Sequence, residues 1–280
     1  MRRRIRKTLT FLSLFSIFLA TPAAALGQVE FPFGKIIPRP APDKDKEAKE
    51  KKEPSKPREA PAQTVQRAAQ AHGGLEARRA VQDSVADGQV TYFTAEGPGP
   101  TFPIRISRKG SKVQRRIQQP AGELREGSNG TASWQSAAGF TMGVSGGPVA
   151  RFIATQTSRS VESLLDFQSR GLALREGNSK GNARVLELDE APGLAVKTRY
   201  VIDDATSLVT EIQFVTAEAK DMFGNPAPQT ETWKYSDYRN VLGVLEPFRI
   251  ERYVNNRKIE ETQLQSIRHN SSVQDEVFKP

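Results

Sequence analysis

The chain has 280 residues, no cysteine and only two histidines, His72 and His269. The lack of cysteine excludes disulfides and a cysteine nucleophile, and two isolated histidines cannot assemble the usual zinc sites. The formal charge is +9, but from Ala60 onward the sequence has 27 basic and 25 acidic residues. The positive charge therefore belongs to the N-terminal part, and we expect no nucleic-acid partner.

Residues 1–27 have the pattern of a secretory signal peptide. Five basic residues fall within 1–7, an apolar stretch with small hydroxyls follows at 8–20, and three alanines come after Pro22. A basic start, a short apolar segment and a small-residue cleavage site are typical of a cleaved signal. The alternative is an uncleaved anchor in the inner membrane. It is less favoured because a bilayer span needs about 20 apolar residues and Pro22 interrupts this run early. Both interpretations predict export, and we expect a periplasmic protein.

Residues 28–62 are rich in proline, lysine and glutamate. A segment with so little apolar surface cannot offset its chain entropy, so we predict a disordered tether. Its role is that of a spacer. An alternative is that its lysines touch anionic lipid or cell wall, which the interspersed acids make weaker. Residues 63–280 then form a single domain.

Two segments are predicted to be helical. In 64–74, residues Val65, Ala68, Ala69 and His72 recur at helical spacing, and Gly73-Gly74 ends the helix. Residues 75–81 add another helical turn. The second segment is 149–171, in which Ser160 can cap the second half and Gly171 can end it. His72, at a helix end, and His269, at a strand end, are expected to be capping or surface residues.

From about Ser84 the sequence alternates as strands do. Turn residues recur at intervals of roughly ten, which predicts an antiparallel sheet. The expected strand segments are 85–94, 102–118 with a turn at 109–111, 123–136 with a turn at 128–130, 183–190, 194–202, 207–217, 229–239, 243–254 and 257–268. Residues 139–149 are rich in glycine and are expected to be irregular. The fold class is mostly β (α+β), with a large antiparallel sheet of about ten strands.

The motifs of common enzymes are absent from this sequence. There is no G-x-S-x-G elbow, and the glycines of 143–148 lack the lysine and the strand-to-helix context of a phosphate-binding loop. The acidic pairs Asp189-Glu190 and Asp203-Asp204 fall at expected strand ends, where such residues commonly form turns; acid/base chemistry or calcium binding is the less favoured alternative. We therefore expect no catalytic residue, no metal and no cofactor.

One segment is densely basic, because no acid occurs between residues 97 and 122. Its six cations are Arg105, Arg108, Lys109, Lys112, Arg115 and Arg116. On a hairpin, Arg108, Lys112 and Arg116 are expected to project together beside the turn. They either keep a solvated edge from pairing or contact an anionic surface, such as lipid headgroups, lipopolysaccharide or an acidic partner.

Aromatic and branched residues recur at alternate positions of the expected strands. Ten of them are predicted to share one face: Val90, Tyr92, Tyr200, Ile202, Ile212, Phe214, Trp233, Tyr235, Phe248 and Ile250. Two interpretations remain open. The face is either core covered by the helices, or the lining of an apolar cavity that suits an acyl chain or another hydrophobic ligand.

Several stretches resemble the LolA/LolB-like superfamily of lipoprotein carriers, and in particular its outer membrane lipoprotein-sorting protein type. They are residues 68–77 (AAQAHGGLEA), 198–214 (TRYVIDDATSLVTEIQF), 231–270 and 275–280 (DEVFKP). The resemblance implies an unclosed β half-barrel with helices covering its concave side and a cavity that receives acyl chains or lipids. The chain departs from the family in its charged tether and in lacking an acylated cysteine, and no functional residue is carried over.

The favoured function is that of a periplasmic binding or carrier protein for a lipid, a lipoprotein acyl chain or another hydrophobic ligand. The alternative is a non-enzymatic envelope sensor or scaffold protein that binds another protein through the sheet. A hydrolase that uses acidic residues is the least favoured. An anionic membrane surface is a further possible partner, and the sequence leaves the oligomeric state open.

Overall fold

The computed structural model describes residues 59–144, 160–189, 197–216 and 229–280. Every described residue belongs to one compact unit, which spans 55–280. The predicted signal peptide and nearly all of the predicted tether lie outside the described residues. So do the glycine loop 145–148, the first part of the second helical segment and the turn at 191–193.

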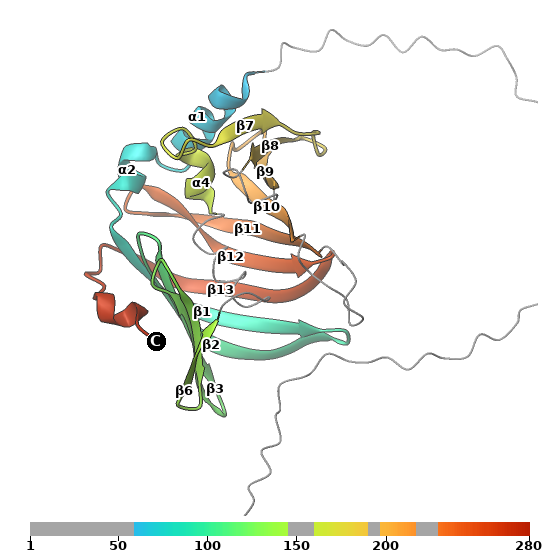
Figure 1. The fold of residues 1–280 in the computed structure, drawn as a ribbon. Helices are drawn as coiled ribbons and strands as arrows, with labels where there is room; N and C mark the ends of the chain where they lie inside the picture. Colours follow the sequence, from blue (N-terminus) through green and yellow to red (C-terminus); the bar gives the residue numbers. More distant parts are fainter. Residues whose placement is uncertain (1–58, 145–159, 190–196, 217–228) are drawn as a thin grey trace, which may run out of the picture. The chain divides into compact units, whose positions relative to one another are not determined.

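The described residues are mostly β and form one antiparallel sheet (Figure 1). Its thirteen strands follow the order β6-β5-β4-β3-β2-β1-β13-β12-β11-β10-β9-β8-β7. Their bounds are β1 Asp83–Thr94, β2 Gly97–Lys109, β3 Lys112–Gln119, β4 Gly122–Ser128, β5 Ser133–Ala137, β6 Phe140–Val144, β7 Ala173–Glu176, β8 Ala183–Asp189, β9 Lys197–Asp203, β10 Val209–Thr216, β11 Gln229–Val241, β12 Val244–Val254 and β13 Arg257–His269. Within the described residues β6 and β7 are the two free edges, so the sheet is not closed.

The expected number of about ten strands is too low. The two strands that the pattern failed to predict are the edges, β6 and β7. β6 lies in the glycine-rich segment that was expected to be irregular, and β7 has four residues. An edge strand pairs on one side only and buries little, so it carries a weak apolar alternation.

The helices are short and few in the described part of the chain: α1 Pro61–Ala71, α2 Leu75–Arg79, α4 Val161–Leu165 and the 3-10 turn η1 Asp275–Phe278. None of them is long or apolar enough to cross a membrane. The predictions of α1 and of an added turn at α2 are confirmed, and Ser160 takes the N-cap position of α4, although its side chain makes no capping hydrogen bond. α1 buries Val65, Ala68 and Ala69 as its spacing predicted.

The end of α1 requires glycine. Gly73 and Gly74 have φ values of 102° and 88°, a region that L side chains rarely adopt. A Cβ on Gly73 would lie 2.1 Å from the carbonyl oxygen of Gly243, whereas a Cβ on Gly74 would meet nothing within 4 Å. The backbone of the β11–β12 turn therefore packs directly on the end of the helix, which fixes α1 against the sheet.

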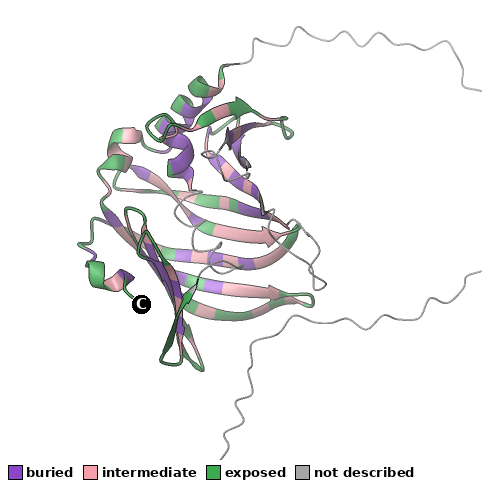
Figure 2. Cartoon of the chain, in the orientation of Figure 1, coloured by how far each residue is buried: buried purple, intermediate pink, exposed green. Residues whose placement is uncertain are grey.

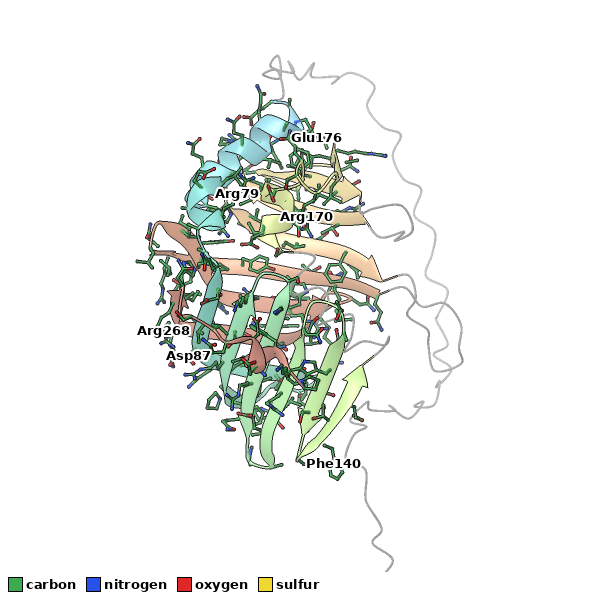
Figure 3. All side chains as sticks on the ribbon, turned by 60° about the vertical axis from the view of Figure 1, so that its left-hand side comes forward. Arg79, Asp87, Phe140, Arg170, Glu176 and Arg268 are labelled. Carbon is green, nitrogen blue, oxygen red and sulfur yellow. The ribbon has the colours of Figure 1, made fainter. Side chains whose placement is uncertain are left out.

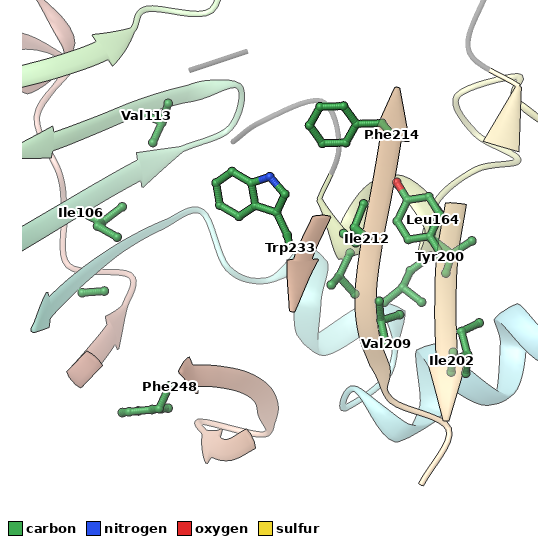
Figure 4. Close-up of a cluster of buried hydrophobic side chains, with 14 of the residues drawn as sticks. Ile106, Val113, Leu164, Tyr200, Ile202, Val209, Ile212, Phe214, Trp233 and Phe248 are labelled. Carbon is green, nitrogen blue, oxygen red and sulfur yellow. The ribbon is translucent and has the colours of Figure 1, made fainter. Parts of the chain in front are cut away.

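One face of the sheet, which we call the inner face, carries Ile106 and Ile212 and packs against α1 and α4. The strand pairing places all ten predicted residues on this face, because each is either a cross-strand partner of another inner-face residue or two positions from one. Figure 4 shows several of them beside Leu164 of α4. Figure 2 shows the buried residues along the strands and on the helices.

The opposite, outer face is covered near β3–β5 by the C-terminal segment. The indole Nε1 of Trp134 donates to the backbone oxygen of Phe278 at 3.1 Å, and both side chains are buried. Gln114 of β3 donates to the backbone oxygen of Val277. The C-terminal residues are thus part of the folded domain.

Candidate functional site

The inner face contains a cavity of about 500 Å³ beside the β2–β3 hairpin. Its apolar lining includes Ala86, Ile106, Val161, Trp233, Tyr235, Val244, Ile250, Leu264 and Ile267. These residues come from β1, β2, α4, β11, β12 and β13. The cavity therefore opens among the central strands, whereas the strands toward β7 are covered by α1 and α4.

The pairing of β2, β1 and β13 gives this lining two rows of different chemistry. Arg108 pairs with Ser84, and Ser84 pairs with His269, so these three side chains form a polar row on the inner face. The next row on the same face is apolar and consists of Ile106, Ala86 and Ile267. Adjacent strands lie about 4.8 Å apart, so the side chains of each row are neighbours, and all six of these residues line the cavity. The cavity is therefore amphipathic.

Three of the ten predicted residues line the cavity: Trp233, Tyr235 and Ile250. The other seven are not among its lining residues, and six of these are fully buried in the core: Val90, Tyr200, Ile202, Ile212, Phe214 and Phe248. The two interpretations left open by the sequence thus apply to different parts of one face. The face is packed core under α1 and α4 and at Val90 and Phe248, and it lines a cavity at Trp233, Tyr235 and Ile250.

Two lining residues, Leu264 and Ile267, were missed because they are three positions apart. Period-two alternation places such residues on opposite faces. The β1–β13 pairing is irregular between Asp87 and Gly88, where Asp87 pairs with Ser266 and Gly88 with Leu264. One residue of β13 is therefore extra, and this bulge returns both apolar side chains to the inner face. The nearby Gly88 was a signal that such a bulge exists.

The basic segment is not a uniform surface, and Arg115 does not belong to that surface at all. Its side chain is 4% exposed and its guanidinium contacts the carboxylates of Glu126 at 2.8 Å and Glu260 at 2.7 Å. Desolvation, helped by the charge of Glu260 but opposed by that of Arg115, raises the pKa of Glu126. The expectation of a surface contact fails for Arg115 because its position alternates onto the inner face with Ile117.

The expected cluster of Arg108, Lys112 and Arg116 does not form either. Arg108 pairs with Val113 and lies on the inner face, whereas Lys112 and Arg116 alternate to the other face of β3. Arg116 is engaged with Glu123 by several contacts of 2.8–3.1 Å. Arg108 nevertheless lines the cavity together with the hairpin-tip residues Lys109 and Lys112.

His72 is the C-cap residue of α1, as the expectation of a capping histidine allowed, but it lies in the core and not at the surface. It follows the last residue of α1, but its side chain is fully buried, and its Nε2 accepts a hydrogen bond from the backbone N–H of Val209 at 3.2 Å. Its ring meets Tyr238 edge-on, with centroids 5.4 Å apart. Burial, and to a lesser extent the charge of Arg78, lowers the pKa of His72 to about 4. The ring is therefore neutral and structural near pH 7.

His269 is also buried, which corrects the same expectation at the end of β13. Its side chain is 2% exposed and its Nε2 lies 3.3 Å from a carboxylate oxygen of Glu246. Its Nδ1 has no hydrogen-bond partner, and neither has the buried Nε of Arg78. Both residues line the cavity.

The acidic pairs do not assemble a reactive site in the part of the chain that is described. Asp203 accepts hydrogen bonds from the backbone N–H and the hydroxyl of Thr206, both at 2.7 Å, which is the turn role that its position suggested. Glu190 lies outside the described residues. Among those residues no group of three or more potential ligands is placed to hold a metal ion.

Comparisons of the sequence with protein-family models and with curated proteins find no match. The fold does have relatives among solved structures. A LolA superfamily protein from Nitrosomonas europaea aligns with a TM-score of 0.51 and 13% identity, over 79% of this chain and 99% of that one. The chain has a LolA-like fold.

A DUF1329 family protein from Desulfovibrio piger aligns with the same LolA-like fold at a TM-score of 0.52 and 11% identity, over 79% of this chain and 98% of the other. The resemblance seen in the sequence is confirmed at the level of fold. Identities this low carry no residue roles from one protein to another. Any function for this LolA-like domain must therefore be argued from its own cavity.

Proposed function

We propose that the protein is a non-enzymatic periplasmic carrier that holds a hydrophobic ligand in the cavity of the inner face. The observation that carries the proposal is the cavity itself, which is lined by apolar residues such as Ile106, Trp233 and Ile250 together with many polar and charged ones. Ligand sites are typically concave, mostly apolar and equipped with a few polar groups. The LolA-like fold and the predicted signal peptide support the same role and the periplasmic location.

The packing of the inner face also supports a cavity rather than a collapsed core. A face that only served as core would be covered along its length, as it is where Leu164 of α4 meets Ile212. At the central strands Tyr235, Ile250 and Ile267 are only partly buried. When a ligand covers apolar side chains that contact solvent inside a concave site, the free energy falls, which favours binding.

Filling the cavity tests the proposal. Uptake of a fluorescent fatty acid by wild type should be abolished by Ile267→Trp, which adds an aromatic ring to the lining. Phe140→Trp adds bulk at a side chain that is 72% exposed and lies outside the cavity, so it should leave uptake unchanged. Circular dichroism and thermal melts establish that both variants are folded. Uptake that survives Ile267→Trp undiminished would show that the ligand binds elsewhere.

A second candidate, binding of another protein through the sheet, is favoured by the edge strand β6. Phe140 and Met142 are 72% and 64% exposed, and they lie on the same strand at the free edge of the sheet. Figure 3 shows Phe140 projecting at that edge. Free backbone groups beside exposed apolar side chains are suited to the addition of a partner strand.

Protein binding at this edge predicts a different result, which a pull-down and the fatty-acid uptake assay together can detect. Replacing Phe140 and Met142 with aspartate should abolish the capture of an envelope partner in a pull-down while fatty-acid uptake stays intact. A partner that binds the double variant as well as wild type would exclude this edge as the docking site.

A further inference from the structure

The polar row of Arg108, Ser84 and His269 indicates what kind of ligand the cavity accepts. An acyl chain alone would desolvate these groups and leave the Nδ1 of His269 without a partner, which is costly. The apolar row of Ile106, Ala86 and Ile267 lies beside it on the same three strands. A ligand that satisfies both rows has a polar head and an apolar tail.

Two buried nitrogens point independently to a polar group of the ligand. The Nδ1 of His269 and the Nε of Arg78 have no hydrogen-bond partner, and the two side chains are 2% and 8% exposed. The remaining polar atoms of these side chains are engaged: Arg78 contacts Glu162 and donates to the backbone oxygen of Leu245 at 2.9 Å. Unsatisfied buried polar groups are rare in native proteins, and the residues that carry these two nitrogens, His269 and Arg78, line the cavity.

The charge around the polar row favours an anion. Arg108 forms no ion pair with a carboxylate of the described residues, although it projects from the inner face into the lining. Lys109 and Lys112, at the tip of the same hairpin, share one carboxylate, that of Asp275, at 3.0 and 3.1 Å. These two lysines at the edge of the cavity therefore share a single acid, and Arg108 adds a third cation beside them.

The carboxylates that line the cavity are already occupied by protein groups. Asp83 accepts backbone N–H bonds from Ser271 at 2.7 Å and Val273 at 3.2 Å. The other three are paired with cationic or imidazole side chains: Glu162 with Arg78, Asp166 with Arg79, and Glu246 with His269. Arg108 lies within electrostatic range of Glu162, whose carboxylate is already paired with Arg78, and it has no ion-pair partner of its own among the described carboxylates.

The size of the cavity limits the apolar part of the ligand. About 500 Å³ lies within the range of roughly 300–1,000 Å³ that holds one small-molecule ligand. Such a volume suits a single chain better than the several chains of a lipoprotein anchor.

We propose that the cavity binds a single-chain amphiphile with an anionic head, either a carboxylate or a phosphate. The head lies at Arg108, Ser84 and His269, and the tail lies along Ile106, Ala86 and Ile267 toward Ile250. This proposal rests on the proposed carrier function and adds a ligand class and an orientation to it.

Amphiphiles of equal chain length and different heads test this assignment on the full chain. The ligands are hexadecanoic acid, the lysophosphatidic acid with the same chain, hexadecanol, and a two-chain phosphatidic acid. Wild type should bind at least one single-chain anion roughly tenfold or more tightly than hexadecanol, as expected for a hydrogen bond between charged groups. The tighter of the two anions identifies the head as carboxylate or phosphate.

Variants then locate the head. Arg108→Gln should remove the preference for the anion and leave the affinity for hexadecanol unchanged, and Arg108→Lys should restore part of the preference. Arg116→Gln, which removes a cation on the other face of the sheet, should behave as wild type. Equal binding of anion and alcohol by wild type would overturn the anionic head, and phosphatidic acid bound as tightly as its single-chain form would overturn the single chain. If no ligand binds at all, hexadecanol included, the carrier function itself fails.

Discussion

Arg115 of β3 and Glu260 of β13 are joined by a contact of 2.7 Å, although β2 and β1 lie between their strands in the sheet. Two side chains can meet across two intervening strands only where the sheet curves strongly toward them. The contact therefore shows that the inner face is concave at these strands, beside the cavity.

Removing Arg115 should destabilise the protein severely. Arg115→Met leaves the buried carboxylates of Glu126 and Glu260 without their cation, which typically costs roughly 3–5 kcal/mol. Arg116→Met, at an exposed ion pair one residue away, should cost less than about 1 kcal/mol. Chemical denaturation at pH 7 measures both. Burial raises the pKa of Glu126, so this carboxylate becomes protonated and neutral as the pH falls, and the stability lost in Arg115→Met should then decrease. Equal losses of stability in Arg115→Met and Arg116→Met at pH 7 would contradict a structural role of the buried Arg115 ion pairs.

His72 should make the stability depend on pH. Its pKa is lowered from 6.5 to about 4 on folding, so between these two pH values the histidine is protonated in the unfolded chain and neutral in the folded protein. The contribution of His72 to the free energy of unfolding is therefore fully present above pH 6.5 and is lost as the pH falls toward 4. One site with this shift contributes about 3 kcal/mol over that interval.

The matching variant is His72→Gln, whose amide oxygen can accept the N–H of Val209 without titrating. Between pH 7 and pH 4 wild type should lose about 3 kcal/mol more of its unfolding free energy than this variant. The comparison cancels the titration of the acidic residues that both proteins share. Parallel curves for the two proteins would contradict a buried, neutral His72.

Alanine substitutions at Gly73 and Gly74 should distinguish the cost of backbone strain from the cost of a steric clash. Both have positive φ, which costs an alanine roughly 1–2 kcal/mol. Gly73→Ala also places its Cβ against the carbonyl of Gly243, so it should be clearly more destabilising than Gly74→Ala. Thermal unfolding measures the difference. Equal melting temperatures would mean that the β11–β12 turn yields to the added methyl group.

Truncation of Ile212 and of Ile250 should distinguish packed core from the lining of the cavity. Ile212 is fully buried in the core, and Ile250 is partly buried and lines the cavity. Truncation of a packed isoleucine costs roughly 2–5 kcal/mol, so Ile212→Ala should fall in that range and Ile250→Ala below it. Only Ile250→Ala should change ligand affinity while the protein stays folded. A larger stability loss at Ile250 would show that the site is filled core.

Much of the inner face was predictable because the strands with strong period-two alternation carry it. Trp233 with Tyr235, and Phe248 with Ile250, needed only their spacing to be assigned to one face. The cavity was not predictable, because it depends on where α1 and α4 end over the sheet, and no local pattern records that.

The polar row of the cavity could not be predicted for a related reason. Ser84, Arg108 and His269 are far apart in the sequence and meet through the registers of two strand pairs. His269 looked like a surface residue because it closes a strand, and the sequence does not show that Glu246 of a neighbouring strand reaches it. Arg108 and Arg116 have similar settings in the sequence, and only the register of the β2–β3 hairpin shows that they lie on opposite faces of the sheet.

Native mass spectrometry of the full chain purified gently from its own host tests the carrier function most directly. The proposed function predicts a population that is heavier than the polypeptide by the mass of one lipid, and that shifts to the unliganded mass in Ile267→Trp. A spectrum of wild type that holds the polypeptide mass alone, and that stays unchanged after incubation with hexadecanoic acid, would contradict it.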